Sequence, residues 1–218
     1  MTKTRYIVLE GCEGVGKTTQ TKRLAEYLRN RGYSVLETKE PGTPHSPLTM
    51  TLRGIMLDNQ YDAEMTMASR EFVSQAIRSV HLEKVIKPAL NEYDFIIQDR
   101  GILSGLAYGT GCGNDAELLL VLTSYSLHTS GIDVAHPGEL YNDVVYLTGN
   151  VSAGRDRALA SKQEFAAGDA MESKGNEFLT TVSDNMRDMS AMFNTKTVSV
   201  DGKDKDQVFA DILTALKL

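Results

Sequence analysis

The chain has 218 residues and a mass of 23.9 kDa, which fits one ordinary domain, or one domain with a mobile appendage. Its hydrophobic fraction of 41% and charged fraction of 24% are typical of a globular protein and exclude a wholly disordered chain. A formal net charge of −6 argues against broad binding to nucleic acid or to an anionic membrane, but it leaves room for a local basic pocket.

The sequence contains no feature that predicts a membrane or secreted protein. No apolar run reaches 18 residues, and residues 1–5 lead directly into a short strand-like run, so we expect neither a membrane-spanning helix nor a signal peptide. Cys12 and Cys112 are the two cysteines. They cannot build a disulfide framework or a zinc site of the usual spacing, which predicts a cytoplasmic protein.

Five short, apolar runs are typical of strands that are buried on both faces of a parallel sheet. They cover residues 6–9, 33–36, 95–97, 144–147 and 197–200. Helical periodicity fills the intervals between them, at 18–31, 72–90, 118–127, 178–193 and 208–216. Strands that alternate with helices predict right-handed crossovers. We therefore expect one three-layer α/β domain over residues 1–218, built on a five-stranded parallel sheet.

One segment differs from the rest in composition. Residues 159–177 are rich in Ala, Gly, Ser and charge and hold few large apolar side chains. This composition favours a mobile lid over a core element, and we place the lid at approximately residues 155–177. An idle surface helix and loop would have the same composition.

The first strand is followed by a phosphate-binding motif. Residues 11–18 read Gly-Cys-Glu-Gly-Val-Gly-Lys-Thr, which fits the P-loop pattern G-x-x-x-x-G-K-[ST] between a strand and a helix. Glycines let the backbone N–H groups point inward, and the helix N-terminus attracts anions. We expect Lys17 to contact the β- and γ-phosphates, the Thr18 hydroxyl to bind Mg²⁺ and Thr19 to reach the α-phosphate. The motif predicts ATP or GTP binding.

A carboxylate ends the strand at residues 95–97. Asp99 stands where a P-loop protein orients Mg²⁺ and its waters, and Arg100 follows it directly. Strands often end in Asp, so the P-loop is what favours the metal-binding interpretation of this residue. The chain lacks an NKxD-like guanine-reading motif, which weighs against a GTPase.

These motifs resemble those of the thymidylate kinase family over nearly the full length of the chain. Beside the P-loop, the similar segments are Lys-Glu-Pro-Gly-Thr-Pro at 39–44, the Leu-Arg to Leu-Asp stretch at 52–58, Arg78 ten residues before Pro88, and Asp99-Arg100 with Ser104, Ala107 and Tyr108. The resemblance implies transfer of the γ-phosphoryl group of ATP to a deoxynucleoside 5′-monophosphate, most simply dTMP, with Mg²⁺ as cofactor. It also implies a homodimer, in which the apolar run at 118–122 is either core or part of the interface.

The resemblance also assigns roles to residues. It implies that Arg100 holds the acceptor phosphate, Glu13 contacts the acceptor sugar or its bound water and metal, Tyr108 disfavours ribose, and Arg78 reaches the base edge. Val15 in place of a P-loop arginine implies that lid cations stabilise the transferring group. The implied catalytic residues are Lys17, Asp99, Arg100, Arg157 and Lys162. The implied ATP-binding residues are Gly11, Cys12, Glu13, Gly14, Val15, Gly16, Lys17, Thr18, Thr19 and Arg155. The implied acceptor-binding residues are Glu13, Glu40, Pro41, Arg53, Phe72, Ser74, Arg78, Arg100, Ser104, Gly105 and Tyr108, and the implied metal ligands are Thr18 and Asp99.

The chain departs from the family pattern in the base pocket and the lid. Ser74 stands at the family's base-stacking phenylalanine, and Phe72 would replace that ring only if the helix rotates or shifts. Gly105 replaces a larger polar residue, Gly101 replaces a tyrosine, and one lid arginine is absent at 169–172. We therefore expect a roomier base pocket that accepts a 5-substituted deoxyuridylate or several bases. Such departures would fit a protein from the cytosol of a bacterium or of a virus-infected cell. The alternative from another class is a P-loop ATPase switch that uses no acceptor.

Overall fold

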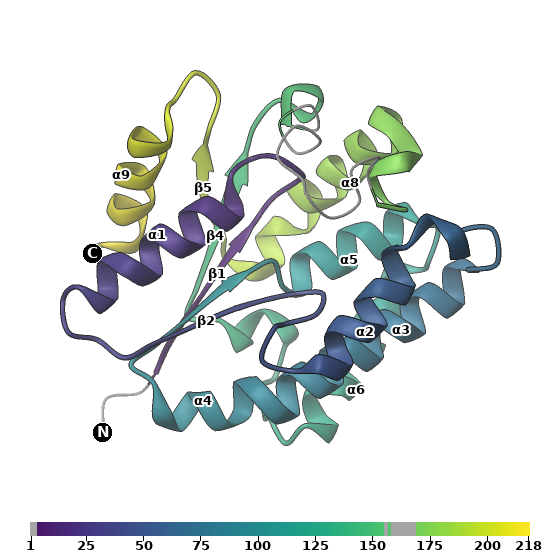
Figure 1. Ribbon diagram of the computed structural model, residues 1–218, viewed down its shortest axis with the longest axis horizontal. Helices are drawn as coiled ribbons and strands as arrows, with labels where there is room; N and C mark the ends of the chain where they lie inside the picture. Colours follow the sequence, from purple (N-terminus) through teal and green to yellow (C-terminus); the bar gives the residue numbers. More distant parts are fainter. Residues whose placement is uncertain (1–3, 155–156, 158–168) are drawn as a thin grey trace.

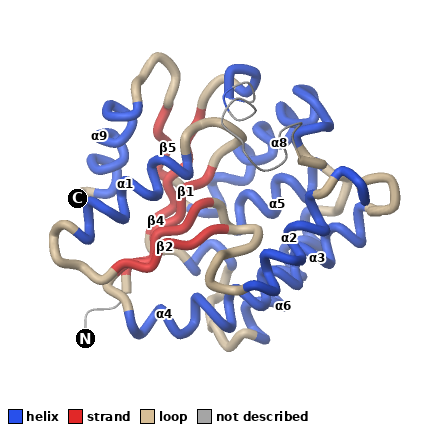
Figure 2. The backbone as a smooth tube through the Cα atoms, viewed as in Figure 1, coloured by secondary structure: helices blue, strands red, loops and turns tan. Residues whose placement is uncertain are grey.

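The computed structural model describes residues 4–154, 157 and 169–218. Its centre is a parallel sheet of five strands in the order β2-β3-β1-β4-β5 (Figures 1 and 2). The strands are β1 (Arg5–Glu10), β2 (Val35–Lys39), β3 (Phe95–Asp99), β4 (Asp143–Thr148) and β5 (Lys196–Ser199). The expected five-stranded parallel sheet is confirmed.

Helices cover both faces of the sheet, so the molecule has three layers (Figure 1). The described helices are α1 (Lys17–Arg29), α2 (Pro47–Leu57), α3 (Met67–His81), α4 (Lys87–Glu92), α5 (Ile102–Gly111), α6 (Ala116–Thr129), α8 (Gly175–Met189) and α9 (Lys205–Leu216). One apolar cluster joins α1 and α9 to the sheet, and a second joins α5 and α8 to its other face. Because the central strands are buried on both sides, they consist of apolar runs rather than alternating residues.

The helix predicted over residues 72–90 is three pieces in the structure. A π-helical turn, η2 (Leu82–Ile86), separates α3 from α4. Pro88 lies in the first turn of α4, where the missing N–H of proline costs no hydrogen bond. The second predicted strand also starts later than expected, because Tyr33 is exposed and packs its ring edge-on against Phe95 before β2 begins.

Two helices, α2 and α5, were not predicted from the sequence. Gly54 interrupts α2, and α5 contains Gly105 and Gly109, residues that lower helix propensity by about 1 kcal/mol each. Packing against α3 and α8 stabilises these helices instead. Tertiary contacts therefore override local propensity in the two elements that flank the site described below.

The proposed lid lies mostly outside the described residues, because 155, 156 and 158–168 are not among them. Its described end is not on the surface. Asp169, Ala170 and Met171 are buried, and the last two pack in a cluster with Met56 and Leu57. The Ala170 N–H donates to the Leu57 carbonyl at 2.9 Å. The composition of the segment predicted that these residues belong to a lid rather than to the core. They are buried instead, because they close the end of the core beside α2.

Candidate active site

The P-loop wraps the N-terminus of α1 at the carboxyl edge of β1. Gly11, Gly14 and Gly16 have φ angles of 143°, 67° and 94°, a region that favours glycine. A Cβ on Gly14 would lie 1.7 Å from the carbonyl oxygen of Gly154, so no side chain fits there. The first turn of α1 has no side-chain cap and no acidic residue. Its N–H groups are therefore free of a competing side-chain acceptor and can bind an anion.

Lys17, Thr18 and Asp99 form the polar centre beside this loop. The buried Lys17 ammonium donates to the Cys12 carbonyl at 2.5 Å. Burial and then the nearby Arg100 lower the pKa of Lys17, against the opposing effect of Glu13 and Asp99. Thr18 Oγ1 donates to Asp99 Oδ2 at 2.5 Å. Asp99 Oδ1 is buried and has no hydrogen-bond partner among the described residues.

The unpartnered Asp99 oxygen fits a divalent cation. A buried polar atom without a partner needs an explanation, and Mg²⁺ prefers one or two protein oxygens together with water and phosphate oxygens. Asp99 and Thr18 supply these oxygens at the mouth of the P-loop. The residues present therefore fit Mg²⁺.

Arg100 connects the P-loop to the neighbouring helix. Its φ of 63° is unusual for a residue with a side chain, and such strain is common at functional sites. The guanidinium donates to Glu13 Oε1 at 2.5 Å, to the Gly11 carbonyl at 3.0 Å and to Ser104 Oγ at 3.2 Å. Burial alone would lower the pKa of Arg100, but Glu13 and the phenol of Tyr108 outweigh it and raise that pKa. Arg100 is therefore a fixed positive charge.

The carboxylate of Glu10 holds the start of α5 by hydrogen bonds. It accepts from the N–H groups of Gly101 and Ser104 at 2.9 and 3.2 Å, and from the Ser104 hydroxyl. Burial raises the pKa of Glu10, while the Ser104 hydrogen bonds oppose that rise. This role was not predicted from the sequence, because Glu10 is the last residue of an apolar strand. Glu10 fixes Ser104 beside Arg100.

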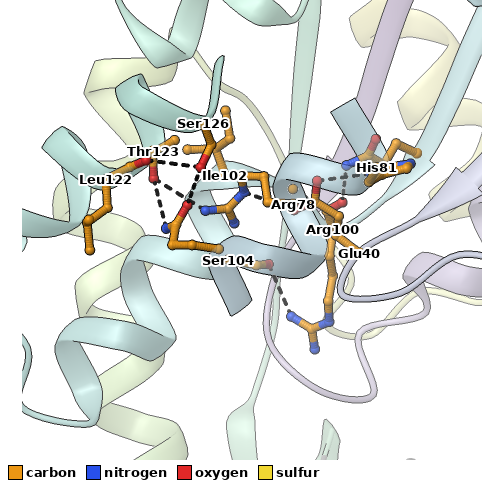
Figure 3. A network of polar contacts seen from close by, with 12 residues as sticks. Glu40, Arg78, His81, Arg100, Ile102, Ser104, Leu122, Thr123 and Ser126 are labelled. Carbon is orange, nitrogen blue, oxygen red and sulfur yellow. Dashed lines mark hydrogen bonds and ion pairs between the residues drawn. The ribbon is translucent and has the colours of Figure 1, made fainter. Parts of the chain in front are cut away.

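A second buried network fixes Arg78 on α3 (Figure 3). Arg78 Nε donates to Glu40 Oε2 at 3.2 Å, and Nη1 donates to Thr123 Oγ1 at 3.3 Å. His81 lies 3.1 Å from the other Glu40 oxygen through Nδ1 and 2.8 Å from Thr38 through Nε2. Burial would raise the pKa of Glu40, but Arg78 and His81 outweigh it, so that pKa is lowered. Arg78 therefore cannot turn away without leaving a buried carboxylate unpaired.

Two cavities meet at these networks. The first, of about 870 Å³ including its open mouth, lies between α2, α3 and α5, and the second surrounds the P-loop. Both are lined by Glu13, Glu40, Arg53, Arg100 and Asp169. Arg100 thus faces two adjoining ligand sites at once.

The structure brings most of the predicted site residues to these cavities. The P-loop cleft contains the predicted Glu13, Gly14, Val15, Gly16, Lys17, Thr18, Thr19, Asp99, Arg100 and Arg157. Arg157 Nε donates to the Gly14 carbonyl at 3.1 Å. The other cavity contains the predicted Glu40, Pro41, Arg53, Ser74, Arg78, Ser104, Gly105 and Tyr108. Arg155 and Lys162 lie outside the described residues.

Phe72 does not line the cavity between α2, α3 and α5, which is called the acceptor cavity below because it contains the predicted acceptor-binding residues. The predicted role of Phe72 in binding the acceptor is therefore wrong. The Phe72 side chain is 63% exposed. The cavity is lined by the opposite face of α3, through Met67, Arg70, Glu71, Ser74, Ile77 and Arg78. Residue 72 is about 200° around the helix from residue 74, at 3.6 residues per turn. The rotation of α3 that would bring this ring inward is absent.

The expected extra room at Gly105 and Gly101 is occupied by other side chains. A Cβ on Gly105 would lie 2.2 Å from Arg78 Nη2. A Cβ on Gly101 would lie 2.3 Å from the hydroxyl of Tyr141, which accepts from the Ile102 N–H at 3.1 Å. The prediction of a pocket enlarged at these glycines is therefore wrong, because Arg78 and Tyr141 fill the space.

The sequence analysis missed several residues that line the cavities. In the acceptor cavity these are Met56, Leu57, Met67, Arg70, Glu71, Ile77, Gly101, Gly109, Cys112, Asn114, Asp169 and Met171. Helical spacing from Arg78 back along α3 identifies Glu71 and Ser74 as members of one face. No comparable periodicity leads to Asp169 or Met171, which reach the cavity from far along the chain.

The fold and site define a P-loop phosphotransferase. The guanidinium of Arg100 lies between the P-loop cleft and the second cavity, which would hold the phosphate acceptor. This is the arrangement of a nucleoside monophosphate kinase, because two polyanions must meet in line for a phosphoryl group to move between them.

Comparison of the sequence and the structure with known proteins identifies the family within this class. The family model for thymidylate kinase matches residues 9–212. The chain is 32% identical over 202 residues to a thymidylate kinase of Prochlorococcus marinus strain AS9601, covering 90% of this chain and 88% of that one. It is 34% identical over 180 residues to that of Nitrosospira multiformis, covering 82% and 79% of the two chains. A crystal structure of thymidylate kinase from Ehrlichia chaffeensis superposes with a TM-score of 0.71 at 23% identity and 99% coverage of both chains, which supports the fold. The chain belongs to the thymidylate kinase family.

Proposed function

We propose that this protein transfers the γ-phosphoryl group of ATP to the 5′-phosphate of dTMP, giving ADP and dTDP. A phosphate oxygen of dTMP attacks the γ-phosphorus, a new P–O bond forms, and the bond from the γ-phosphorus to the bridging oxygen breaks as ADP leaves. The acceptor phosphate is already ionised at neutral pH, so positioned charge matters more than a general base. The single observation that carries this proposal is Arg100, which faces both cavities.

Each charged group near the reaction has a place in this scheme. Lys17 and the N–H groups of the P-loop bind the donor phosphates, and Arg100 holds the acceptor phosphate between the two sites. Thr18 and Asp99 would hold Mg²⁺, which, when bound, neutralises phosphate charge. Arg157 donates to the Gly14 carbonyl of the P-loop and would stabilise the transferring group. Arg155 and Lys162 lie outside the described residues, and their roles stay predictions from the sequence.

The decisive experiment is an acceptor-dependent ADP-release assay with Mg·ATP and dTMP. Lys17→Ala serves as the blank. We expect Arg100→Ala to raise the KM for dTMP and lower kcat/KM about 100-fold, while ATP binding changes little. Arg29→Ala, at an exposed arginine of α1, is the matched control and should keep wild-type rates. ADP release that is independent of every acceptor would overturn the kinase proposal and favour an ATPase switch.

We also propose that the protein is a homodimer and acts without a membrane. The long helices α2, α3 and α6 pack side by side (Figure 2), and several of their apolar side chains are exposed, namely Leu48, Ile55, Met67, Phe72, Leu118, Val121 and Tyr125. Exposed apolar side chains on neighbouring helices favour a self-complementary interface. Among the helices that the structure describes, none has the length and hydropathy needed to span a bilayer.

A further inference from the structure

Glu71 is a buried acid in the wall of the acceptor cavity, and the mechanism above does not use it. It lies on the inner face of α3, one turn before Ser74 and two turns before Arg78, and all three line the cavity. Its side chain is 8% exposed. A buried carboxylate beside a site for a phosphorylated ligand adds unfavourable charge, so its presence there requires a favourable contact.

The contacts of Glu71 leave one carboxyl oxygen unused. Among the described residues it accepts one hydrogen bond, from Gln75 Nε2 to Oε1 at 2.7 Å. By contrast, Glu13 and Glu40 in the same cavity are ion-paired to arginines. Burial raises the pKa of Glu71, and the Gln75 hydrogen bond and Arg78 oppose that rise. A carboxylate oxygen that opens onto a cavity is available to a donor on the ligand.

Arg78 presents the complementary atom on the same face. Its Nε and Nη1 are used by Glu40 and Thr123, whereas Nη2 donates to no described residue. Nη2 lies over Gly105, and Glu71 Oε2 lies over Gly109, because a Cβ on these glycines would be 2.2 and 3.0 Å from those atoms. The two glycines are one turn apart on α5, about 6 Å.

The cavity wall thus offers a donor and an acceptor at neighbouring positions. Both residues line the same cavity, so a single ligand can contact the donor and the acceptor together. Thymine and uracil carry a carbonyl oxygen next to a ring N3–H, so their edge accepts from a donor and donates to an acceptor in the same order. Cytosine presents the reverse order, an amino group next to an unprotonated ring nitrogen. Two unmatched buried groups would make cytosine unfavourable.

We propose that Glu71 determines base specificity by accepting a hydrogen bond from the N3–H of the acceptor's pyrimidine, beside the carbonyl to which Arg78 donates. This inference rests on the proposed function, because it needs a nucleotide in the acceptor cavity. It assigns recognition of the N3–H of dTMP to Glu71, within the substrate class of the proposed function. The position of Glu71 on the cavity side of α3 gives this residue the role that Phe72 cannot fill.

The test compares dTMP, N3-methyl-dTMP and dCMP as acceptors with the wild-type protein, Glu71→Gln and Glu71→Leu. The wild type should prefer dTMP over N3-methyl-dTMP and over dCMP by about 10- to 100-fold in kcat/KM. Glu71→Leu should raise the KM for dTMP, with a smaller change in kcat, and bring the dTMP to N3-methyl-dTMP ratio close to one. Glu71→Gln keeps an accepting carbonyl and should keep most of that ratio. Glu83→Leu, at an exposed acid of the following turn, should behave as the wild type.

The outcomes separate this inference from the proposed function. If no acceptor stimulates ADP release, the kinase proposal fails. If dTMP is phosphorylated but the wild type uses N3-methyl-dTMP equally well, only the role of Glu71 is overturned, and this result needs no variant to fold. The same role is overturned if Glu71→Leu slows both acceptors by one factor and keeps their ratio, since a merely structural residue would behave in that way.

Discussion

At the scale of single residues, carboxylates of the site hold its arginine side chains in fixed orientations by ion pairs. Glu13 fixes Arg100, and Glu40 with His81 fixes Arg78. The Glu40 pair is buried and the Glu13 pair is half-buried, and removing one partner would leave the other uncompensated. Cationic groups that bind phosphate or a base edge are therefore oriented before the ligand arrives. This reduces the entropy that binding must overcome.

Asp99→Asn should separate metal binding from folding. The substitution keeps an oxygen for Thr18 but removes the charge at the unpartnered Oδ1 position. We expect kcat for dTMP phosphorylation to fall about 100-fold and the Mg²⁺ dependence of ATP binding, measured by calorimetry, to weaken. Asp94→Asn, at the half-buried residue before β3, is the control. Unchanged Mg²⁺ dependence in Asp99→Asn would contradict the assigned role of Asp99.

Gly105→Ala should impair acceptor binding by displacing Arg78. The added Cβ would lie 2.2 Å from Nη2 of that guanidinium, so Arg78 must shift away from the cavity. We expect the KM for dTMP to rise about 10-fold, the cost of one weakened charged hydrogen bond, with the KM for ATP unchanged. The matched control is Gly54→Ala, where a Cβ meets no atom within 4 Å and helix propensity favours alanine. An unaltered dTMP KM in Gly105→Ala would show that Arg78 does not contact the acceptor.

At the scale of elements, the strands begin at a shared ion cluster opposite the active edge. Asp143 at the start of β4 accepts from Arg5 Nε of β1 at 2.7 Å and pairs with Lys196 of β5. Burial alone would raise the pKa of Asp143, but the hydrogen bonds from Arg5 and Lys196 outweigh it and lower that pKa. The cluster therefore ties three neighbouring strands together while Asp143 is ionised.

Asp143→Asn should lower stability at neutral pH and lose its effect in acid. Since the pKa of Asp143 is lowered on folding, its contribution is present above the unfolded pKa of about 3.9. That contribution is lost as the pH falls through the folded value. We expect the variant to be less stable by about 1 to 3 kcal/mol at pH 7, measured by urea unfolding, and nearly equal to wild type well below pH 4. Asp133→Asn, at an exposed position, should show little change. A constant difference at all pH values would exclude ionisation as the cause.

At the scale of the whole molecule, the two faces of α3 have different roles. One face lines the acceptor cavity, and the other exposes Phe72 beside the apolar side chains of α6. An interface on the outer face would hold α3 in position, so dimer formation and acceptor binding would share one helix. The proposed interface would account for the exposed apolar side chains of α6, which has more apolar residues than a one-sided helix requires.

Val121→Glu should weaken the proposed homodimer. Val121 is 63% exposed, and Leu118 and Tyr125 lie near it on one face of α6. A charge buried at this surface would oppose association. We expect light scattering after size exclusion to give a dimer for the wild type and a monomer for Val121→Glu at micromolar concentration. Met192→Glu, at an exposed apolar residue of the 3-10 turn Ser190–Phe193, should remain dimeric. A wild-type monomer would contradict the proposed homodimer.

The sequence by itself determined the class of fold, the phosphate-binding loop and the positions of Asp99 and Arg100. These depend on local patterns, because apolar strands, a glycine-rich loop and the residue at a strand end carry their meaning within a few positions. It also favoured the right family, on motifs spread along the chain. Arg100 and Glu13 could be predicted together because both follow adjacent parallel strands, whose carboxyl ends share one edge of the sheet.

Only the tertiary structure decided which side chains line the cavity between α2, α3 and α5. Helices α2 and α5 form despite their glycines because packing stabilises them, and the angle of α3 excludes Phe72 and admits Glu71. Arg78 occupies the space that Gly105 leaves, and Asp169 and Met171 arrive from a distant segment. Such choices depend on which side chains meet across elements, and the free energy of those contacts is not encoded in any single window of sequence.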